Sequence, residues 1–205
     1  MGPEVILGLA RNFMESRILL TGAELNLFTV LAPVPLSAEE VATRVGADLR
    51  AATILLDALS AMGLLVKQAG KYQCPPAISP FLSAETPHSI LPMILHMAHV
   101  WERWAGLTGM AKGVRVQEKP TAPSQDAGEL RAFIGAMHAI AAPLAPRVVT
   151  AVGPAASRAL LDVGGGSGTY TLAFLQALPE MRGTLFDRPA VVEMARERLS
   201  EAGVL

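Results

Sequence analysis

The chain has 205 residues, of which 51% are apolar and 17% charged, and its net charge is -1. This balance argues against a general nucleic-acid or anionic-membrane binder, because both depend on clustered positive charge. The single cysteine, Cys74, excludes a disulfide framework. No run reaches the ~18 apolar residues of a membrane helix, and charged Glu4 and Arg11 interrupt the apolar start, so we expect a cytoplasmic protein without membrane partners.

The first part of the chain predicts helices. Residues 4–20 and 22–31 carry apolar side chains at helical spacing. Ser37 and Glu40 match a capping box, in which each side chain binds the other residue's backbone N–H. We expect that helix to end at Gly46.

A second helix and a hairpin follow. Asp48 can cap a helix over about 49–62, and we expect its inner face to carry Ile54, Leu55, Ala58 and Leu59. The segment "LLVKQAGKYQC" predicts a hairpin that turns near Ala69-Gly70. Helix, turn, helix and hairpin in this order are typical of a winged helix.

A winged helix raises the alternative of a DNA-binding regulator. Across residues 37–75, four basic side chains balance four acidic ones, so the net charge is zero. The helix that would enter the groove has one basic residue, Arg50. DNA affinity depends mainly on phosphate neutralisation, so packing or dimerisation is the favoured role of this segment.

The middle of the chain predicts further helices around a loop. Residues 86–112 form a long apolar helical region, and the polar, proline-bearing segment 115–129 predicts a loop. Asp126 can start a helix that continues to about residue 152. Pro143 and Pro146 should kink or divide it.

The last part predicts the opening of a doubly wound parallel sheet. Residues 158–163 form a short apolar run, which predicts a buried strand, and residues 181–187 predict a second strand. Helices are expected over 169–179 and 188–203. The order strand, glycine turn, helix, strand, helix is typical of this architecture.

The glycine turn between the first strand and its helix predicts a ligand site. Asp162, Gly164, Gly166 and Gly168 fit the pattern D-x-G-x-G-x-G, whereas Thr169 breaks the dinucleotide fingerprint and the P-loop pattern is absent. Glycines expose backbone N–H groups, and the following helix directs its positive end to the same place. The turn can therefore hold a carboxylate or a phosphate.

An acidic residue at the end of the second strand narrows the ligand. Asp187 follows Gly164 by 23 positions, and a carboxylate there can accept hydrogen bonds from both ribose hydroxyls. The combination describes a nucleoside with a small anionic group and no pyrophosphate, which is the make-up of S-adenosylmethionine. Two alternatives stay open: the turn packs helix on strand and nothing more, and Asp162 holds the loop rather than the cofactor.

Three segments carry a family resemblance. "LLDVGGGSGTYTLAFLQALP", "TLFDRPAVVEMARERL" and "LSAEEVATRVGADLRAATILLDALSAMGLL" resemble the S-adenosylmethionine-dependent O-methyltransferases of the caffeate, hydroxyindole and polyketide-tailoring type. "FIGAMHAI" is similar to the family's linker helix. The resemblance implies a mainly α fold with an α/β portion: a winged-helix dimerisation domain over 1–112, connecting helices over 113–157, and the first part of a Rossmann-like cofactor domain over 158–205.

The resemblance also implies a homodimer, an acceptor and a set of site residues. The acceptor is a hydroxyl of a small aromatic or polyketide-like molecule. The implied cofactor-binding residues are Asp162, Gly164, Gly165, Gly166, Gly168, Asp187 and Arg188. Phe133, Met137 and His138 are implied to lie near the acceptor.

The catalytic base is not expected within this sequence. In the family it is a histidine of a later "LHDW"-like motif, and no such motif precedes Leu205. We therefore assign no catalytic residue and no metal site, and we expect the 205-residue chain alone to be inactive and to bind cofactor poorly. The alternative is a non-catalytic dimerisation protein with a vestigial cofactor loop.

Overall fold

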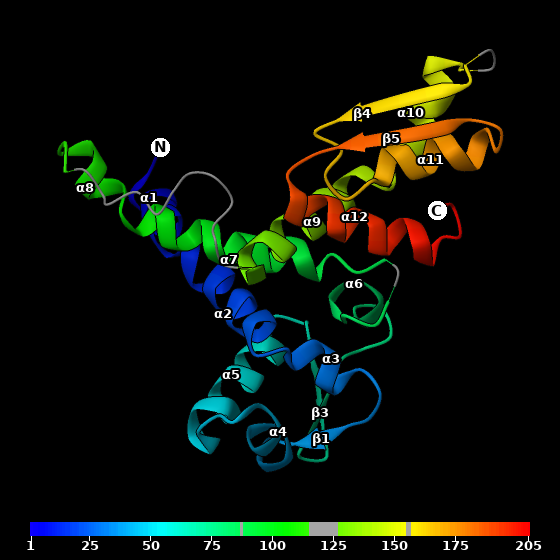
Figure 1. The fold of residues 1–205 in the computed structure, drawn as a ribbon. Helices are drawn as coiled ribbons and strands as arrows, with labels where there is room; N and C mark the ends of the chain where they lie inside the picture. The colour runs from blue at the N-terminus through cyan, green and yellow to red at the C-terminus, as the bar shows by residue number, and fades with distance from the viewer. Residues whose placement is uncertain (87, 115–126, 155–156) are drawn as a thin grey trace. The chain divides into compact units, whose positions relative to one another are not determined.

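The computed structural model describes residues 1–86, 88–114, 127–154 and 157–205 (Figure 1). It divides into two compact units, Met1–Val116 and Gln117–Leu205. Most of the loop predicted over 115–129, including the expected helix start at Asp126, lies outside the described residues, and its last three residues are helical instead.

The first unit is mainly helical with one small sheet. Its helices are α1 (Pro3–Arg11), α2 (Phe13–Glu24), α3 (Leu27–Leu31), α4 (Ala38–Val45), α5 (Leu49–Ala61), α6 (Ser79–Leu82), α7 (Leu91–Ala105) and α8 (Leu107–Ala111). Its strands are β1 (Leu36–Ser37), β2 (Val66–Gln68) and β3 (Lys71–Gln73). The strands pair antiparallel in the order β1-β3-β2, which gives the predicted winged helix.

The local signals of the winged helix are confirmed. The Ser37 hydroxyl accepts a hydrogen bond from the Glu40 backbone N–H, and the Glu40 carboxylate accepts one from the Ser37 N–H at 2.7 Å. Asp48 caps α5 by accepting from the Ala51 N–H at 2.9 Å. The hairpin turns at Ala69 and Gly70, which both have positive φ, as a tight two-residue hairpin turn requires.

Three expectations for the first unit need correction. The predicted helix over 4–20 is divided between α1 and α2 at Asn12, and the one over 22–31 is interrupted where Asn26 adopts φ 54. Asparagine visits this left-handed region more readily than most residues. Ile54 was expected on the inner face of α5 but is 59% exposed. The prediction is confirmed for Leu59, which is buried on α5 together with Ala52 and Leu56.

The core of the first unit forms where the helices meet the sheet. Its fully buried members come from α3, α4, α5 and the hairpin, and include Leu27, Phe28, Leu31, Val41, Leu56, Leu59, Leu65 and Tyr72. Outside this core, α1 has no buried residue, and its apolar side chains Val5, Ile6 and Leu9 are all exposed. A helix with an unburied apolar surface suits contact with a partner.

The second unit contains two helices followed by the predicted strand–helix–strand–helix order. Its elements are α9 (Ala127–Ala141), α10 (Ala145–Val152), β4 (Ala159–Val163), α11 (Thr169–Ala177), β5 (Arg182–Phe186) and α12 (Pro189–Glu201). The predicted division near Pro143 is confirmed, since α9 and α10 meet at a 57° bend. Among the described residues no single helix has the length and composition to span a membrane; only this bent pair reaches them together.

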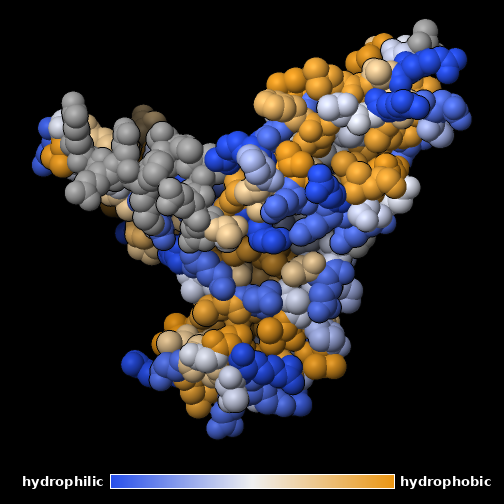
Figure 2. All heavy atoms as spheres, in the orientation of Figure 1, coloured by the Kyte–Doolittle hydropathy of each residue, from blue (hydrophilic) through white to orange (hydrophobic). Residues whose placement is uncertain are grey.

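The parallel strands β4 and β5 expose one face of their sheet. Leu160 and Leu185 lie on the face covered by helices, with Leu160 in a cluster around Phe174 and Met181. On the other face Leu161, Val163 and Phe186 are 66%, 68% and 65% exposed. The expectation of a buried first strand is therefore wrong for this face, and Figure 2 shows apolar atoms at the surface over these strands.

Candidate functional site

The glycine loop begins where β4 ends. Gly164 and Gly166 adopt φ values of 72 and 54, a region of backbone conformation that residues with a Cβ atom disfavour. The Gly164 N–H donates to the Phe186 carbonyl at 2.8 Å, which extends the β4–β5 ladder by one residue. Gly168 then starts α11. The loop is thereby fixed at the carboxyl edge of the sheet, beside the positive end of a helix.

The outer side of the loop is open. A Cβ placed on Gly164 would meet no atom within 4 Å, and one on Gly166 would meet only the Gly164 carbonyl oxygen at 3.9 Å. Gly165 differs, since its Cβ would lie 2.5 Å from Leu185 Cγ. Gly164 and Gly166 therefore leave space for a ligand, whereas the lack of a side chain at Gly165 serves packing on β5.

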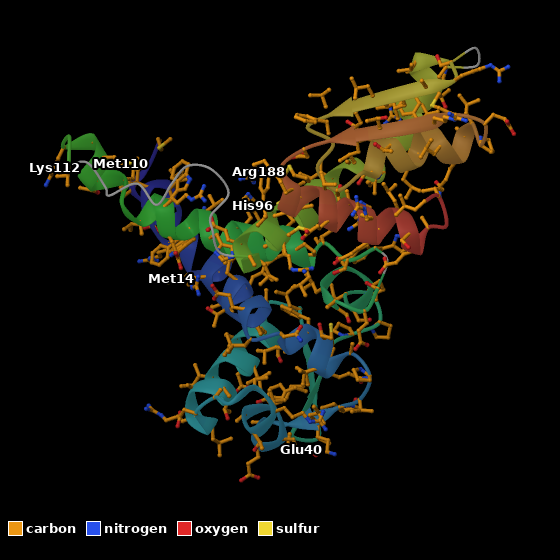
Figure 3. All side chains as sticks on the ribbon, viewed as in Figure 1. Met14, Glu40, His96, Met110, Lys112 and Arg188 are labelled. Atoms are coloured by element: carbon orange, nitrogen blue, oxygen red, sulfur yellow. The ribbon has the colours of Figure 1, made fainter. Side chains whose placement is uncertain are left out.

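Asp187 lies directly beside this loop. Val163 pairs with Phe186, so the next residue of each strand brings Gly164 and Asp187 together. One carboxylate oxygen accepts from the Gly166 N–H at 2.9 Å, and the other accepts from the Arg188 N–H at 2.7 Å. A carboxylate has about four acceptor positions, so half-exposed Asp187 keeps capacity for a ligand's hydroxyls. Arg188 is exposed at the start of α12 (Figure 3).

Asp162 holds a different contact. Its carboxylate accepts a hydrogen bond from the Thr171 hydroxyl at 2.6 Å, on the helix-covered side of β4. Thr171 belongs to the first turn of α11 and is 2% exposed. The bond ties the strand to the helix across the loop, which favours the structural role that sequence reasoning had left open for Asp162.

His138 reaches the loop from α9. Its Nδ1 lies 2.7 Å from Thr169 Oγ1, which in turn lies 2.7 Å from Ser167 Oγ. Both hydroxyl residues are buried. Burial, with the nearby positive charge of Arg198, lowers the pKa of His138 to about 4, so the imidazole is neutral at pH 7. Sequence reasoning missed Ser167 and Thr169, although they are the side chains that interrupt and follow the glycines.

The other two residues expected near the acceptor lie on the same helix. Phe133 is half-buried and packs with Leu130, Ile134, Val191 and Met194, between α9 and α12. Met137 is also half-buried. The structure thus brings His138 to the loop and Phe133 to a contact between helices, and an acceptor contact by any of the three stays a prediction.

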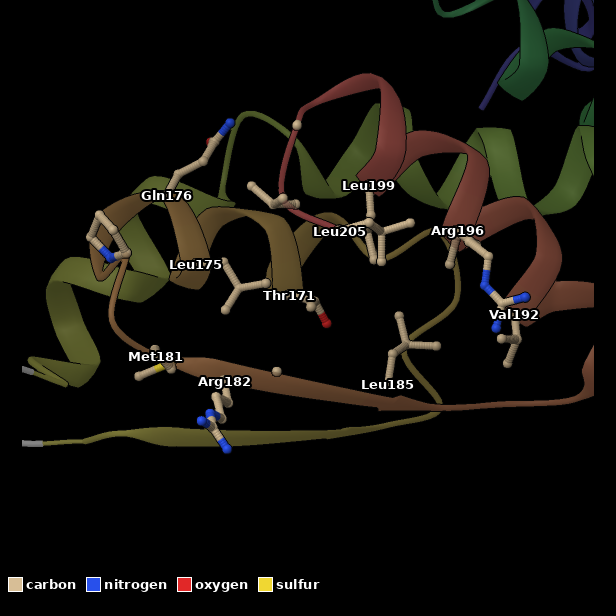
Figure 4. Close-up of a pocket in the computed structure, with 15 residues that line it drawn as sticks. Thr171, Leu175, Gln176, Met181, Arg182, Leu185, Val192, Arg196, Leu199 and Leu205 are labelled. Carbon is tan, nitrogen blue, oxygen red and sulfur yellow. The ribbon is translucent and has the colours of Figure 1, made fainter.

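One groove of the second unit lies away from the glycine loop. It measures about 800 Å³ and runs along β5 below α11 and α12 (Figure 4). Its lining includes Leu175, Arg182, Leu185, Arg196 and Leu199, but neither Asp187 nor any residue of 164–168. This groove is therefore distinct from the candidate cofactor site. In the part of the chain that the structure describes, no cluster of three His, Cys, Asp or Glu residues could hold a metal ion.

Comparison with protein families gives two matches. Residues 7–83 match an O-methyltransferase dimerisation domain, and residues 109–204 match an O-methyltransferase domain. The boundary between the matches falls close to the division between the two compact units.

Individual relatives agree with the family matches. The chain is 32% identical over 208 residues to the tetracenomycin polyketide synthesis 8-O-methyl transferase TcmO of Streptomyces glaucescens, covering 97% of this chain and 60% of the relative. It is 29% identical to mouse acetylserotonin O-methyltransferase, covering 93% and 54%.

A solved structure supports the same assignment. Human N-acetylserotonin methyltransferase in complex with SAM superimposes with a TM-score of 0.77 at 28% identity, over 96% of this chain and 64% of that one. The chain thus spans between about half and two thirds of the length of the proteins that it matches. Because two family models that match successive parts of the chain, the fold and the glycine-loop geometry agree, the chain belongs to the S-adenosylmethionine-dependent O-methyltransferase family.

Proposed function

We propose that this chain forms the dimerisation part and the first half of the cofactor site of an enzyme that methylates a hydroxyl of a small aromatic or polyketide-like molecule. The observation that carries the proposal is the pairing of the open glycine loop with Asp187 at one edge of the sheet. The family membership and the names of the relatives support the reaction and the acceptor class.

The loop and Asp187 fit the two ends of S-adenosylmethionine. The open side of Gly164 and Gly166 can admit a carboxylate to the backbone N–H groups, close to the start of α11. The remaining acceptor positions of Asp187 can bind ribose hydroxyls. Arg188 adds a positive charge beside Asp187, and a direct cofactor contact by its side chain is part of the proposal.

The cofactor supplies a methyl group on a positively charged sulfur. The protein must then align the acceptor hydroxyl with that methyl group and remove the hydroxyl proton. His138 is a poor candidate for proton removal, because its lowered pKa makes it a weak base and its Nδ1 is engaged with Thr169. We therefore keep His138, Phe133 and Met137 as proposed acceptor-side residues and assign the base to none of them.

A nuclear magnetic resonance titration tests cofactor binding even where affinity is weak. S-Adenosylhomocysteine added to the 205-residue chain should shift the backbone amides of Gly164, Gly166 and Asp187. The substitution Asp187→Ala should reduce these shifts, whereas Glu193→Ala, which removes an exposed acid on α12, should not. Shifts confined to residues distant from the loop would contradict the proposed site.

A radiolabel assay tests catalysis separately. The chain is mixed with S-adenosylmethionine carrying a labelled methyl group and with a panel of small aromatic hydroxyl compounds. We expect no transfer by the 205-residue chain alone, since His138, the histidine that reaches the glycine loop, is a poor base. Transfer by material free of any longer form would refute that expectation while supporting the reaction class.

We also propose that the chain forms a homodimer through its first unit. The dimerisation-domain match supports this, as do the exposed apolar side chains of α1. Analytical ultracentrifugation should give twice the chain mass of 21.6 kDa. The double substitution Ile6→Asp with Leu9→Asp should yield the monomer mass, and Leu161→Asp in the second unit serves as the matched control.

Cytoplasmic location is a further proposal. The single cysteine supports it, because disulfides are rare in reducing compartments. Burial raises the pKa of the Cys74 thiol to about 11, which keeps it protonated and unreactive. Cell fractionation with an antibody to the chain tests the location.

A further inference from the structure

Three polar side chains link α9 to the glycine loop in an unbroken row. His138 Nδ1 lies 2.7 Å from Thr169 Oγ1, and Thr169 Oγ1 lies 2.7 Å from Ser167 Oγ. Ser167 is 5% exposed and Thr169 is 6% exposed, so water competes little for these hydrogen bonds. Buried hydrogen bonds are costly to leave unmade, which makes this row a strong restraint on the loop.

The restrained segment has little conformational preference of its own. Ser167 stands between Gly166 and Gly168, and both glycines have positive φ. Glycine populates many backbone conformations with similar ease, so the segment loses much entropy when it is fixed. Because residues 166 and 168 are glycines, the side chains that can anchor this segment are those of Ser167 and Thr169. His138 is the partner through which this anchor reaches a different helix.

The row is chemically consistent with a neutral histidine. If Nδ1 carries the proton, it donates to Thr169, and Thr169 donates to Ser167. If Nδ1 is the acceptor, Ser167 donates to Thr169, and Thr169 donates to His138. Both directions satisfy the two short contacts. The positive charge of Arg198 on α12 also disfavours a second proton on the ring of His138.

We propose that His138 is a positioning residue that holds the Gly166–Thr169 segment in its ligand-ready conformation through Thr169 and Ser167. The part concerning the cofactor rests on the proposed function, because that segment is where the cofactor carboxylate is expected. Since α9 also carries Phe133 and Met137, the same hydrogen-bonded row connects the proposed acceptor side of the site with the cofactor loop.

The first arm of the test needs no ligand. Amide hydrogen exchange is measured for Gly166, Ser167, Gly168 and Thr169 in the 205-residue chain. His138→Ala should accelerate exchange of these amides about tenfold, which corresponds to losing one buried hydrogen bond of roughly 1.4 kcal/mol. His138→Asn, which places an amide group close to the position of Nδ1, should restore most of the protection.

A double-mutant cycle separates the row from general destabilisation. Thr169→Val removes the hydroxyl at nearly constant volume, and Thr169→Ser keeps it. If His138 acts through Thr169, His138→Ala combined with Thr169→Val should accelerate exchange no more than Thr169→Val alone. The control is Arg131→Gln on the same helix, since Arg131 is exposed and its ion pair with Glu197, at 3.8 Å, lies on the surface. It should leave the loop unchanged.

The second arm measures S-adenosylhomocysteine binding by the amide titration. His138→Ala should raise the dissociation constant about three- to tenfold, and His138→Asn should return it close to the value of the unsubstituted chain. If the unsubstituted chain shows no loop shifts with this ligand, the proposed function fails while the exchange arm still decides the role of His138. The inference is refuted if His138→Ala leaves loop exchange unchanged, if asparagine gives no recovery, or if the two substitutions act additively.

Discussion

Replacing Gly165 by alanine tests how the glycine loop is packed. The added Cβ would lie 2.5 Å from Leu185 Cγ and 2.8 Å from Leu185 Cδ1, about 1 Å closer than ordinary carbon contacts. Gly165 is not among the positive-φ glycines, so the expected cost is steric rather than conformational. Overpacking of this kind costs about 1–3 kcal/mol. We expect Gly165→Ala to lower the free energy of unfolding of the second unit by that amount.

Gly164→Ala provides the matched comparison. Its Cβ would meet no neighbour, but its φ of 72 imposes a backbone cost of about 1–2 kcal/mol. Adding Leu185→Ala separates the two causes, because it removes the atoms that the Gly165 Cβ would strike. Leu185→Ala should offset much of the effect of Gly165→Ala and leave the effect of Gly164→Ala additive.

The assay must observe the second unit alone. Both tryptophans, Trp101 and Trp104, lie in the first unit, so tryptophan fluorescence would not report the loop. Urea denaturation followed through the amide resonances of β4 and β5 resolves the second unit. A coupling energy between Gly165→Ala and Leu185→Ala below about 0.5 kcal/mol would refute the steric account.

Three further predictions follow from contacts within each unit. Burial and Arg198 hold the pKa of folded His138 at about 4, against 6.5 for the ordinary group, so the unfolded state binds the proton first as the pH falls. The stability of the second unit should therefore fall as the pH drops from 6.5 towards 4. In thermal unfolding measured over a pH series, His138→Asn should flatten that dependence. Leu160→Ala should lower the free energy of unfolding by about 2 kcal/mol and Leu161→Ala by under about 0.5 kcal/mol, because the two side chains lie on opposite faces of β4. Equal losses in urea denaturation would contradict the exposure of the Leu161 face. Ser37→Ala should destabilise the first unit by about 1 kcal/mol through loss of the N-cap, and unchanged denaturation by tryptophan fluorescence would count against the capping box.

Features set by a few neighbouring residues were predictable from the sequence. Ser37 and Glu40 are three positions apart, and the hairpin turn involves adjacent Ala69 and Gly70, so their contacts depend little on the rest of the fold. The closeness of Gly164 and Asp187 was also predictable, because parallel strands end at a common edge. In each case the chemistry of the residues determines the local geometry.

Features set by packing between distant segments were not predictable. The helical spacing around Ile54 does not say which side of α5 meets the core, and the structure rotates that face towards Leu56. His138 and Thr169 are 31 positions apart, and nothing in "FIGAMHAI" indicates a hydrogen bond to the loop. Phe133 could fill either a ligand site or a helix contact, and only the arrangement of α9 against α12 decides its neighbours.

The Gly166 N–H already donates to the Asp187 carboxylate, so an anion bound at the glycine loop would compete with Asp187 for this donor. An anion that takes this amide leaves one oxygen of Asp187 short of a donor, and a ribose hydroxyl can replace what was lost. A molecule that carries both groups therefore completes an exchange of partners, whereas one that carries only the anionic group leaves that oxygen of Asp187 without its donor. Free methionine, which brings the anion without the ribose, should therefore bind far more weakly than half of the joined molecule's binding free energy would give. Discrimination against fragments would then arise from a contact that the protein makes with itself.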